Sequence, residues 1–211
     1  MAINSIQHQD FFLVKDDDEG NSFYGFDQEW YNTLWQRRAG CGPTVVANIV
    51  NYLNCTRHGG KHLPLTKKEA LAIMEDVYQY VTPTLRGIPS TQLLYDKVLD
   101  YAKNTGLDIQ LEVLNVPEKW ALRPDFQQLI SFLQKALAKN TPLAFLNLDN
   151  GAEKRLDSWH WVTIISLDHK ENTNSAIINI LDGGKIQEID LGQWFHTTKL
   201  GGGFVSFDVS Y

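Results

Sequence analysis

The chain has 211 residues, of which 43% are hydrophobic, and it carries a formal net charge of −6. This length and composition suit a single domain over residues 1–211 with a sizeable core. The acidic balance offers no basic field to a phosphate backbone, so we expect no nucleic-acid partner. No apolar run reaches the roughly 20 residues of a membrane helix, and no secretory signal pattern is evident. We therefore expect a cytoplasmic protein without a membrane partner.

The N-terminal part is expected to be irregular around one short strand. Residues 10–14 indicate that strand, and the acidic run 16–19 is typical of a solvated turn. An aromatic-rich loop over 23–31 then leads toward the first cysteine. Two glutamines, Gln28 and Gln36, precede this cysteine, and the fold could bring either amide beside it.

The motif Gly40-Cys41-Gly42-Pro43 predicts a cysteine at the start of a helix. Proline is tolerated in the first helical turn, because its missing N–H would have no partner there. The helix dipole at this end favours thiolate over thiol, and the free N–H groups can hold an oxyanion. The apolar residues that follow at helical spacing predict one buried face: Val45, Ile49, Tyr52 and Leu53. Cys41 is therefore a candidate nucleophile, and a buried structural cysteine is the alternative.

The second cysteine, Cys55, is not expected to pair with Cys41. A helix running through both would separate them by about 21 Å, far beyond disulfide reach. Two free thiols suit a reducing compartment. Residues 55–62 are expected to form a polar connection. Within it Cys55, His58 and His62 make an incomplete zinc set, so we assign no metal and leave a zinc-stabilised protein as a minor alternative.

Three more helices are expected in the middle of the chain. Thr66 and Glu69 form a capping box, Ser90 is a second N-cap, and Asp125 opens a third helix. The three helices are expected to run from Thr66 to about Tyr80, from Ser90 to near Gly106, and from Asp125 to Asn140.

Short apolar or alternating runs predict the strands. They cover residues 109–114, 142–148, 159–167, 175–181 and 203–209. Helices thus come mainly before strands, which favours an α+β fold. In it an N-terminal helical lobe, with its central helix starting at Cys41, packs on a C-terminal antiparallel sheet. A cleft between these layers could bring strand residues to the thiol.

His160 and Asp182 are the candidate partners of the thiol. His160 begins an apolar strand, and a neutral imidazole can accept the thiol proton. Asp182 ends the next predicted strand, so antiparallel pairing would place it beside His160. A carboxylate there would orient the imidazole and stabilise its charged form. Taken alone, a strand histidine or an aspartate before two glycines has ordinary structural explanations.

These residues resemble the papain-like cysteine peptidase superfamily, and within it the bacteriocin-processing peptidases of double-glycine leaders. The resemblance spans most of the chain and implies a papain-like fold. It also implies that Cys41 is the nucleophile, His160 the base and then the acid, and Asp182 the orienting group. A glutamine before the cysteine supplies an oxyanion donor in such proteins. Relatives with a Gly-Cys-Gly-Pro motif often have a long gap there, which favours Gln28, and Gln36 stays open.

The resulting prediction is a thiol hydrolase, a cysteine peptidase or amidase working through a covalent acyl-enzyme. It would act on a peptide, amide or thioester and needs no cofactor and no metal. The alternatives are an acyltransferase of the same fold and a peptide-binding module without turnover. The sequence does not decide the oligomeric state.

Overall fold

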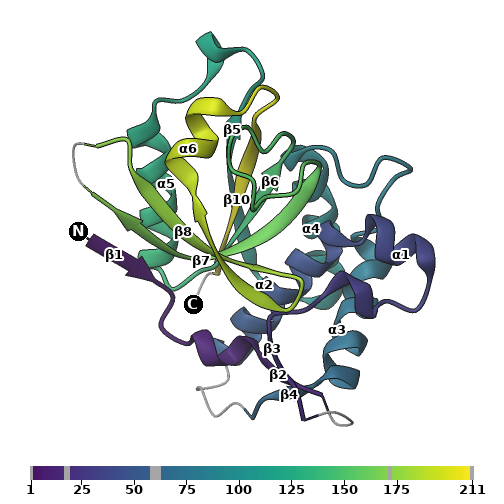
Figure 1. The fold of residues 1–211 in the computed structure, drawn as a ribbon. Helices are drawn as coiled ribbons and strands as arrows, with labels where there is room; N and C mark the ends of the chain where they lie inside the picture. The colour runs from purple at the N-terminus through teal and green to yellow at the C-terminus, as the bar shows by residue number, and fades with distance from the viewer. Residues whose placement is uncertain (1, 17–19, 58–62, 171–172, 210–211) are drawn as a thin grey trace.

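A computed structural model describes residues 2–16, 20–57, 63–170 and 173–209 (Figure 1). A seven-stranded antiparallel sheet forms its centre, with the order β5-β10-β6-β7-β8-β9 and with β1 paired to the later part of β7. The strands are β1 (Ala2–Ser5), β5 (Ile109–Val116), β6 (Leu143–Asn147), β7 (His160–His169), β8 (Ala176–Asp182), β9 (Lys185–Asp190) and β10 (Gly202–Val209). The five strands predicted from residues 109–209 are all present.

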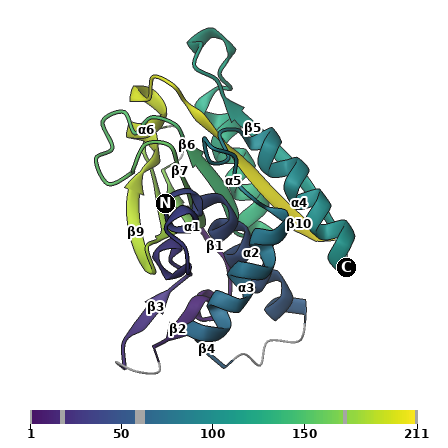
Figure 2. The ribbon, with the colours of Figure 1, turned by 90° about the vertical axis from the view of Figure 1, so that its right-hand side faces the viewer.

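Helices cover both faces of this sheet. On one face lie α2 (Cys41–Arg57) and α4 (Thr91–Thr105), with α3 (Lys67–Tyr80) packed on α2 and the short α1 (Leu34–Ala39) before it. On the other face lie α5 (Phe126–Ala138) and α6 (Leu191–Thr197). Figure 2 shows α2 and α3 side by side next to a small three-stranded sheet. Its strands are β2 (Leu13–Lys15), β3 (Ser22–Tyr24) and β4 (Leu65–Thr66). The expected α+β architecture is confirmed.

Side-chain caps fix where the predicted helices begin. Thr66 and Glu69 form the expected capping box of α3, and Ser90 accepts the Leu93 N–H at the start of α4. Asp125 makes a capping box with Gln128 at the start of α5. Each cap satisfies backbone N–H groups that have no partner inside the helix. The three helix starts predicted from these residues are confirmed.

The predicted strand at residues 10–14 is wrong in its first part. A 3₁₀ helix, η1, occupies Gln9–Phe12, and β2 starts only at Leu13. Phe11 and Phe12 are consecutive and both are buried, and both rings pack against Tyr52. A strand would send consecutive side chains to opposite faces, whereas a helical turn can bury both.

The helix that carries Cys41 is longer and more deeply buried than expected. It continues through Cys55 to Arg57, so the expected polar connection starts later, and 58–62 lie outside the described residues. Residues 42–53 are buried all round because the helix lies between the sheet and α3. Neither cysteine forms a disulfide within the described residues, as predicted. The prediction missed the helices α1 and α6 and the strands β1, β3, β4 and β9.

Candidate active site

Two glycines allow α2 to start with Cys41 in a confined position. A Cβ on Gly40 would lie 2.3 Å from the Gln36 carbonyl oxygen and 2.7 Å from the Tyr31 ring. A Cβ on Gly42 would lie 2.8 Å from Cδ1 of Ile88. Real Cβ atoms do not approach this closely, so glycine is needed at position 40, whereas a side chain at position 42 would only displace the end of the Ile88 side chain. The thiol is half-buried at the junction of α1 and α2 and lines two neighbouring pockets.

His160 and Asp182 come together at one end of the β7–β8 hairpin. Nε2 of His160 lies 2.8 Å from Oδ1 of Asp182, and both side chains are largely buried. The antiparallel register places Leu181 opposite Thr163, which brings Asp182 to the end where β7 begins. The proximity expected from strand order is therefore present.

The His160 ring and Cys41 line the same small pocket. Burial alone would lower the pKa of His160, but the hydrogen-bonded Asp182 carboxylate and the neighbouring Cys41 sulfur outweigh burial and raise this pKa to about 10. Because Nε2 is paired with Asp182, Nδ1 is the ring nitrogen available to the Cys41 sulfur. The ring is thus held in its protonated form at neutral pH, next to a group that can be its counterion.

The two candidate glutamines lie in different environments. Gln28 opens a short 3₁₀ helix, η2 (Gln28–Trp30), and lines the small pocket with Cys41 and His160. Its Oε1 is buried and has no hydrogen-bond partner among the described residues. Gln36 instead completes the capping box of α1 with Thr33 and donates to Glu75 at 2.6 Å. The structure brings Gln28 to the thiol and leaves Gln36 in a helix cap.

Asn48 fixes the segment that carries Gln28, a function that the sequence analysis did not identify. Its Oδ1 accepts the Phe26 N–H at 2.8 Å, and its Nδ2 donates to Thr163 Oγ1 at 3.5 Å. These bonds tie the segment before Gln28 to α2 and to β7. A buried amide in the apolar run of this helix was the available signal, since buried polar side chains need partners.

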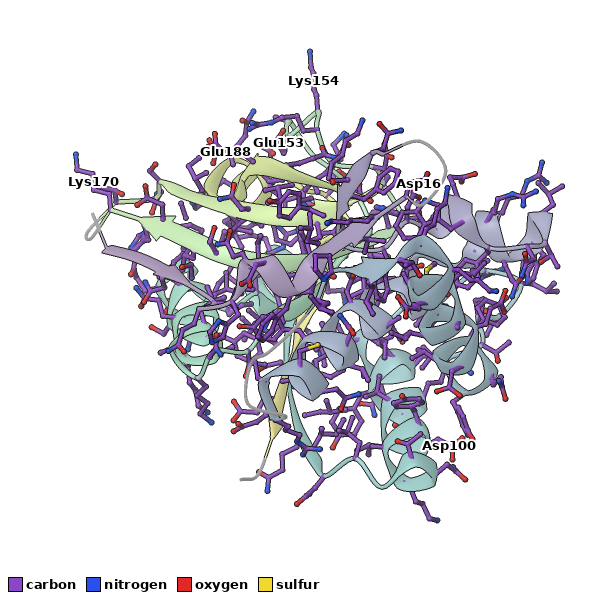
Figure 3. All side chains as sticks on the ribbon, turned by 90° about the horizontal axis from the view of Figure 1, so that it is seen from below. Asp16, Asp100, Glu153, Lys154, Lys170 and Glu188 are labelled. Carbon is purple, nitrogen blue, oxygen red and sulfur yellow. The ribbon has the colours of Figure 1, made fainter. Side chains whose placement is uncertain are left out.

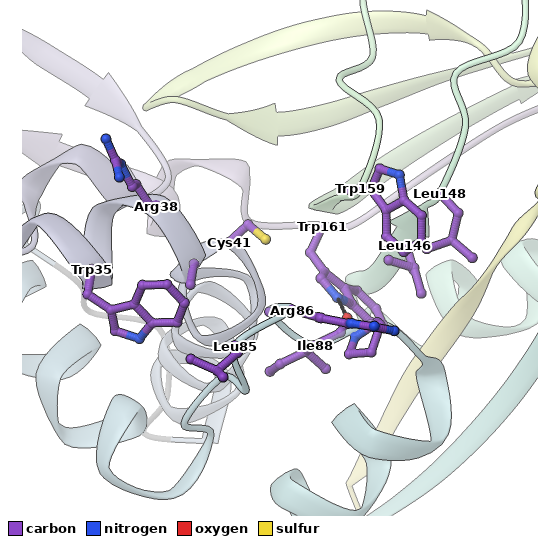
Figure 4. A pocket seen from close by; sticks show the side chains of 13 residues that line it. Trp35, Arg38, Cys41, Leu85, Arg86, Ile88, Leu146, Leu148, Trp159 and Trp161 are labelled. Carbon is purple, nitrogen blue, oxygen red and sulfur yellow. Dashed lines mark hydrogen bonds between the residues drawn. The ribbon is translucent and has the colours of Figure 1, made fainter.

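A larger pocket opens on the other side of Cys41 (Figure 4). It has a volume of about 230 Å³, whereas the small pocket beside His160 has about 10 Å³. Trp161 and Ile88 form part of its lining, and Trp161 Nε1 donates to the Ile88 carbonyl at 2.7 Å. Trp35 and Trp159 are exposed at its edges. No local sequence pattern marks these residues as part of the site.

Trp159 has a strained backbone next to the candidate base. Its φ is 59°, in the left-handed region that bulky residues rarely adopt. It ends the loop between β6 and β7, in which Glu153 is buried and accepts hydrogen bonds from Arg155 and from the Asp190 N–H. Burial by itself raises the pKa of Glu153, but these bonds lower it to about 2. This buried carboxylate fixes the loop, while the neighbouring Lys154 points away from the molecule (Figure 3).

The described residues contain neither a metal cluster nor a membrane helix. No group of three or more His, Cys, Asp or Glu side chains is placed to hold a metal ion within them. Of the incomplete zinc set, His58 and His62 lie outside the described residues. Among the helices in the described part of the chain, none has the length and apolar character needed to cross a bilayer.

Comparisons with known proteins identify the fold. No protein-family model matches the sequence, and no curated protein matches it. A crystal structure of UfSP from C. elegans aligns with 99% of this chain at a TM-score of 0.53 and 10% identity. The alignment covers 34% of the UfSP chain, so this chain spans about a third of that structure's length. The likeness shows the fold alone, and this is the papain-like α+β fold that the sequence predicted.

Proposed function

We propose that this chain forms a single papain-like domain that acts as a thiol hydrolase, a cysteine peptidase or amidase. The observation that carries the proposal is the position of His160, whose ring is bonded to Asp182 and shares the small pocket with Cys41. Nucleophile, base and orienting carboxylate come from three distant segments and meet in one place. A structural histidine would not need a thiol at a helix start on one side and a carboxylate on the other.

The geometry supports a two-step acyl transfer. The Cys41 thiolate attacks the substrate carbonyl carbon, and a carbon–sulfur bond forms as the carbonyl oxygen becomes an oxyanion. The Cys41 backbone N–H and the Gln28 side-chain amide are the candidate donors to that oxyanion. His160 then gives its proton to the leaving amine as the carbon–nitrogen bond breaks. Water attacks the acyl-enzyme, His160 takes the water proton, and the thiolate is released.

The finer resemblance, to peptidases of double-glycine leaders, rests on the motif around Cys41. It remains part of the proposal and can be tested by including a peptide that ends in Gly-Gly among the substrates. An acyltransferase of the same fold would form the same acyl-enzyme and pass it to an amine or alcohol. Product analysis in the presence of an added amine distinguishes hydrolysis from transfer.

The experiment compares Cys41→Ala with Cys55→Ala on peptides carrying a C-terminal coumarin amide. We expect Cys41→Ala to lower kcat/KM at least about a thousandfold, because removing a nucleophile leaves only binding and oxyanion stabilisation. The matched variant Cys55→Ala should keep the rate, because Cys55 lies in the last turns of α2 and lines neither pocket next to Cys41. Intact-protein mass spectrometry should detect the acyl adduct in the wild type and in Cys55→Ala, but not in Cys41→Ala. Equal activity of Cys41→Ala and the wild type would reject the proposal.

A further inference from the structure

The charged lining of the larger pocket is opposite in sign to the protein as a whole. The formal net charge is −6, yet the charged side chains that line this pocket are Arg38 and Arg86. Both side chains are exposed, and neither forms an ion pair within the part of the chain that the structure describes. Two unpaired guanidinium groups in an acidic protein create a local positive field next to Cys41.

A closed turn holds one of these arginines at the pocket. The N–H groups of Thr84 and Gly87 each donate to the other residue's carbonyl at 2.9 Å, and Gly87 has a φ of 72°. The Arg86 N–H donates to the Thr84 hydroxyl, and Ile88, which follows Gly87, is anchored through its carbonyl to Trp161. In Figure 4 Arg86 extends across the pocket, whereas the guanidinium of Arg38 points away from it. Arg86 is therefore the better placed of the two to meet a bound group.

Exposed apolar side chains surround the same pocket. Leu85 is 92% exposed at the tip of the turn, Trp159 is 60% exposed, and Trp35 is 44% exposed. Large apolar side chains gathered around a concave site are typical of a binding surface rather than of a monomer's ordinary surface. Because these side chains stand on a fixed turn, a helix and the last residue of the β6–β7 loop, the surface exists before any ligand binds.

The position of His160 decides which part of a substrate enters this pocket. His160 gives its proton to the leaving group, and it lines the small pocket but not the larger one. The leaving group therefore departs on the His160 side. The acyl part, on the other side of the Cys41 sulfur, faces the larger pocket.

We propose that the pocket selects polypeptide substrates with an acidic side chain on the acyl side of the cleaved bond. Arg86 determines this preference, and Arg38 adds a smaller contribution. Leu85, Trp35 and Trp159 contact apolar parts of the same segment. The inference rests on the proposed function, because it assigns a substrate class to the same site. It goes beyond that function because a thiol hydrolase could equally take neutral or basic peptides.

The test uses matched peptides whose acyl side varies in one charge. N-acetyl tripeptides with a C-terminal coumarin amide carry Glu, Gln or Lys at each position in turn. At one position we expect kcat/KM to be about fivefold higher for the Glu peptide than for the Gln peptide, and about fivefold higher for the Gln peptide than for the Lys peptide. The reason is that each partly exposed charge pair contributes about 1 kcal/mol. Arg86→Glu should reverse this order, and Arg38→Glu should weaken it. Lys103→Glu, the same charge change on an exposed residue of α4 outside the pocket, should leave it unchanged. An unchanged order in Arg86→Glu would overturn the inference.

A second readout does not need turnover. Iodoacetate and iodoacetamide have similar size but differ in charge, and both alkylate a thiol. The rate of Cys41 alkylation by iodoacetate, divided by the rate with iodoacetamide, should fall about fivefold in Arg86→Glu and not in Lys103→Glu. If no peptide is cleaved but this ratio falls, the pocket preference stands and the hydrolase proposal fails. If peptides are cleaved without charge preference, the hydrolase proposal stands and the pocket inference fails. An unchanged ratio in Arg86→Glu also overturns the inference.

Discussion

The two sides of Cys41 are built in different ways. On the His160 side, hydrogen bonds fix the groups in place. His160 is bonded to Asp182, and the segment before Gln28 is bonded to Asn48. On the other side, exposed indoles and guanidinium groups line an open pocket. The first arrangement suits proton transfer, which needs fixed distances, and the second suits the binding of a variable substrate. In the proposed mechanism, chemistry and substrate selection are thus divided between the two sides of the Cys41 sulfur.

The largest difference between the two sides should appear when the two glutamines are replaced. We expect Gln28→Ala to lower kcat about a hundredfold, because the proposed oxyanion donor is lost. Gln36→Ala should leave kcat nearly unchanged and lower the free energy of unfolding by about 1 kcal/mol, because it removes a helix cap. Peptide hydrolysis and urea unfolding of both variants measure these effects. A larger loss of kcat in Gln36→Ala than in Gln28→Ala would contradict the assignment.

A smaller effect should appear in the pH dependence of stability. The folded-state pKa of His160, about 10, lies above its ordinary value of 6.5. The protonated His160 ring therefore stabilises the folded state fully below pH 6.5, and this stabilisation is lost as the pH rises toward 10. Over this range the free energy of unfolding of the wild type should fall on the order of 2 kcal/mol more than that of Asp182→Asn. Urea unfolding at constant ionic strength tests this, and parallel curves for the two proteins would contradict it.

The smallest effect concerns the pocket side. Trp159→Gly removes the cost of a left-handed backbone at a bulky residue, so we expect the free energy of unfolding to rise by up to about 1 kcal/mol. The same variant should lower kcat/KM, because the exposed indole no longer contacts the substrate. Trp159→Ala is the matched control, since it removes the indole but keeps the strain and should gain no stability. A gain in Trp159→Ala equal to that of Trp159→Gly would show that the backbone is not the cause.

The polar side of the site was more predictable from sequence than the pocket side. Cys41 at a helix start, and His160 and Asp182 at strand ends, follow from local patterns and antiparallel order. The choice between Gln28 and Gln36 could not be made, because it depends on a hydrogen bond between Gln36 and a residue on α3. The pocket lining comes from α1, the turn at 84–87 and two strands, and no local pattern links these segments.

The fold shows the same contrast between local and tertiary causes. Helices with strong side-chain caps were placed correctly, since capping acts within four residues. The strand expected at 10–14 was wrong in its first part because burial against Tyr52, far along the chain, decides the conformation of Phe11 and Phe12. Tertiary packing overrode the local pattern there.

The most direct test of the account is the rate at which iodoacetamide alkylates Cys41 at pH 6, with Cys55 in the same molecule as the internal standard. Burial raises the pKa of the Cys55 thiol, so this residue should react slowly. If His160 and Cys41 form an ion pair, Cys41 should react at least about tenfold faster than Cys55, and His160→Ala should abolish the difference. Equal, slow labelling of both thiols in the wild type would contradict the proposed pairing of thiol and imidazole.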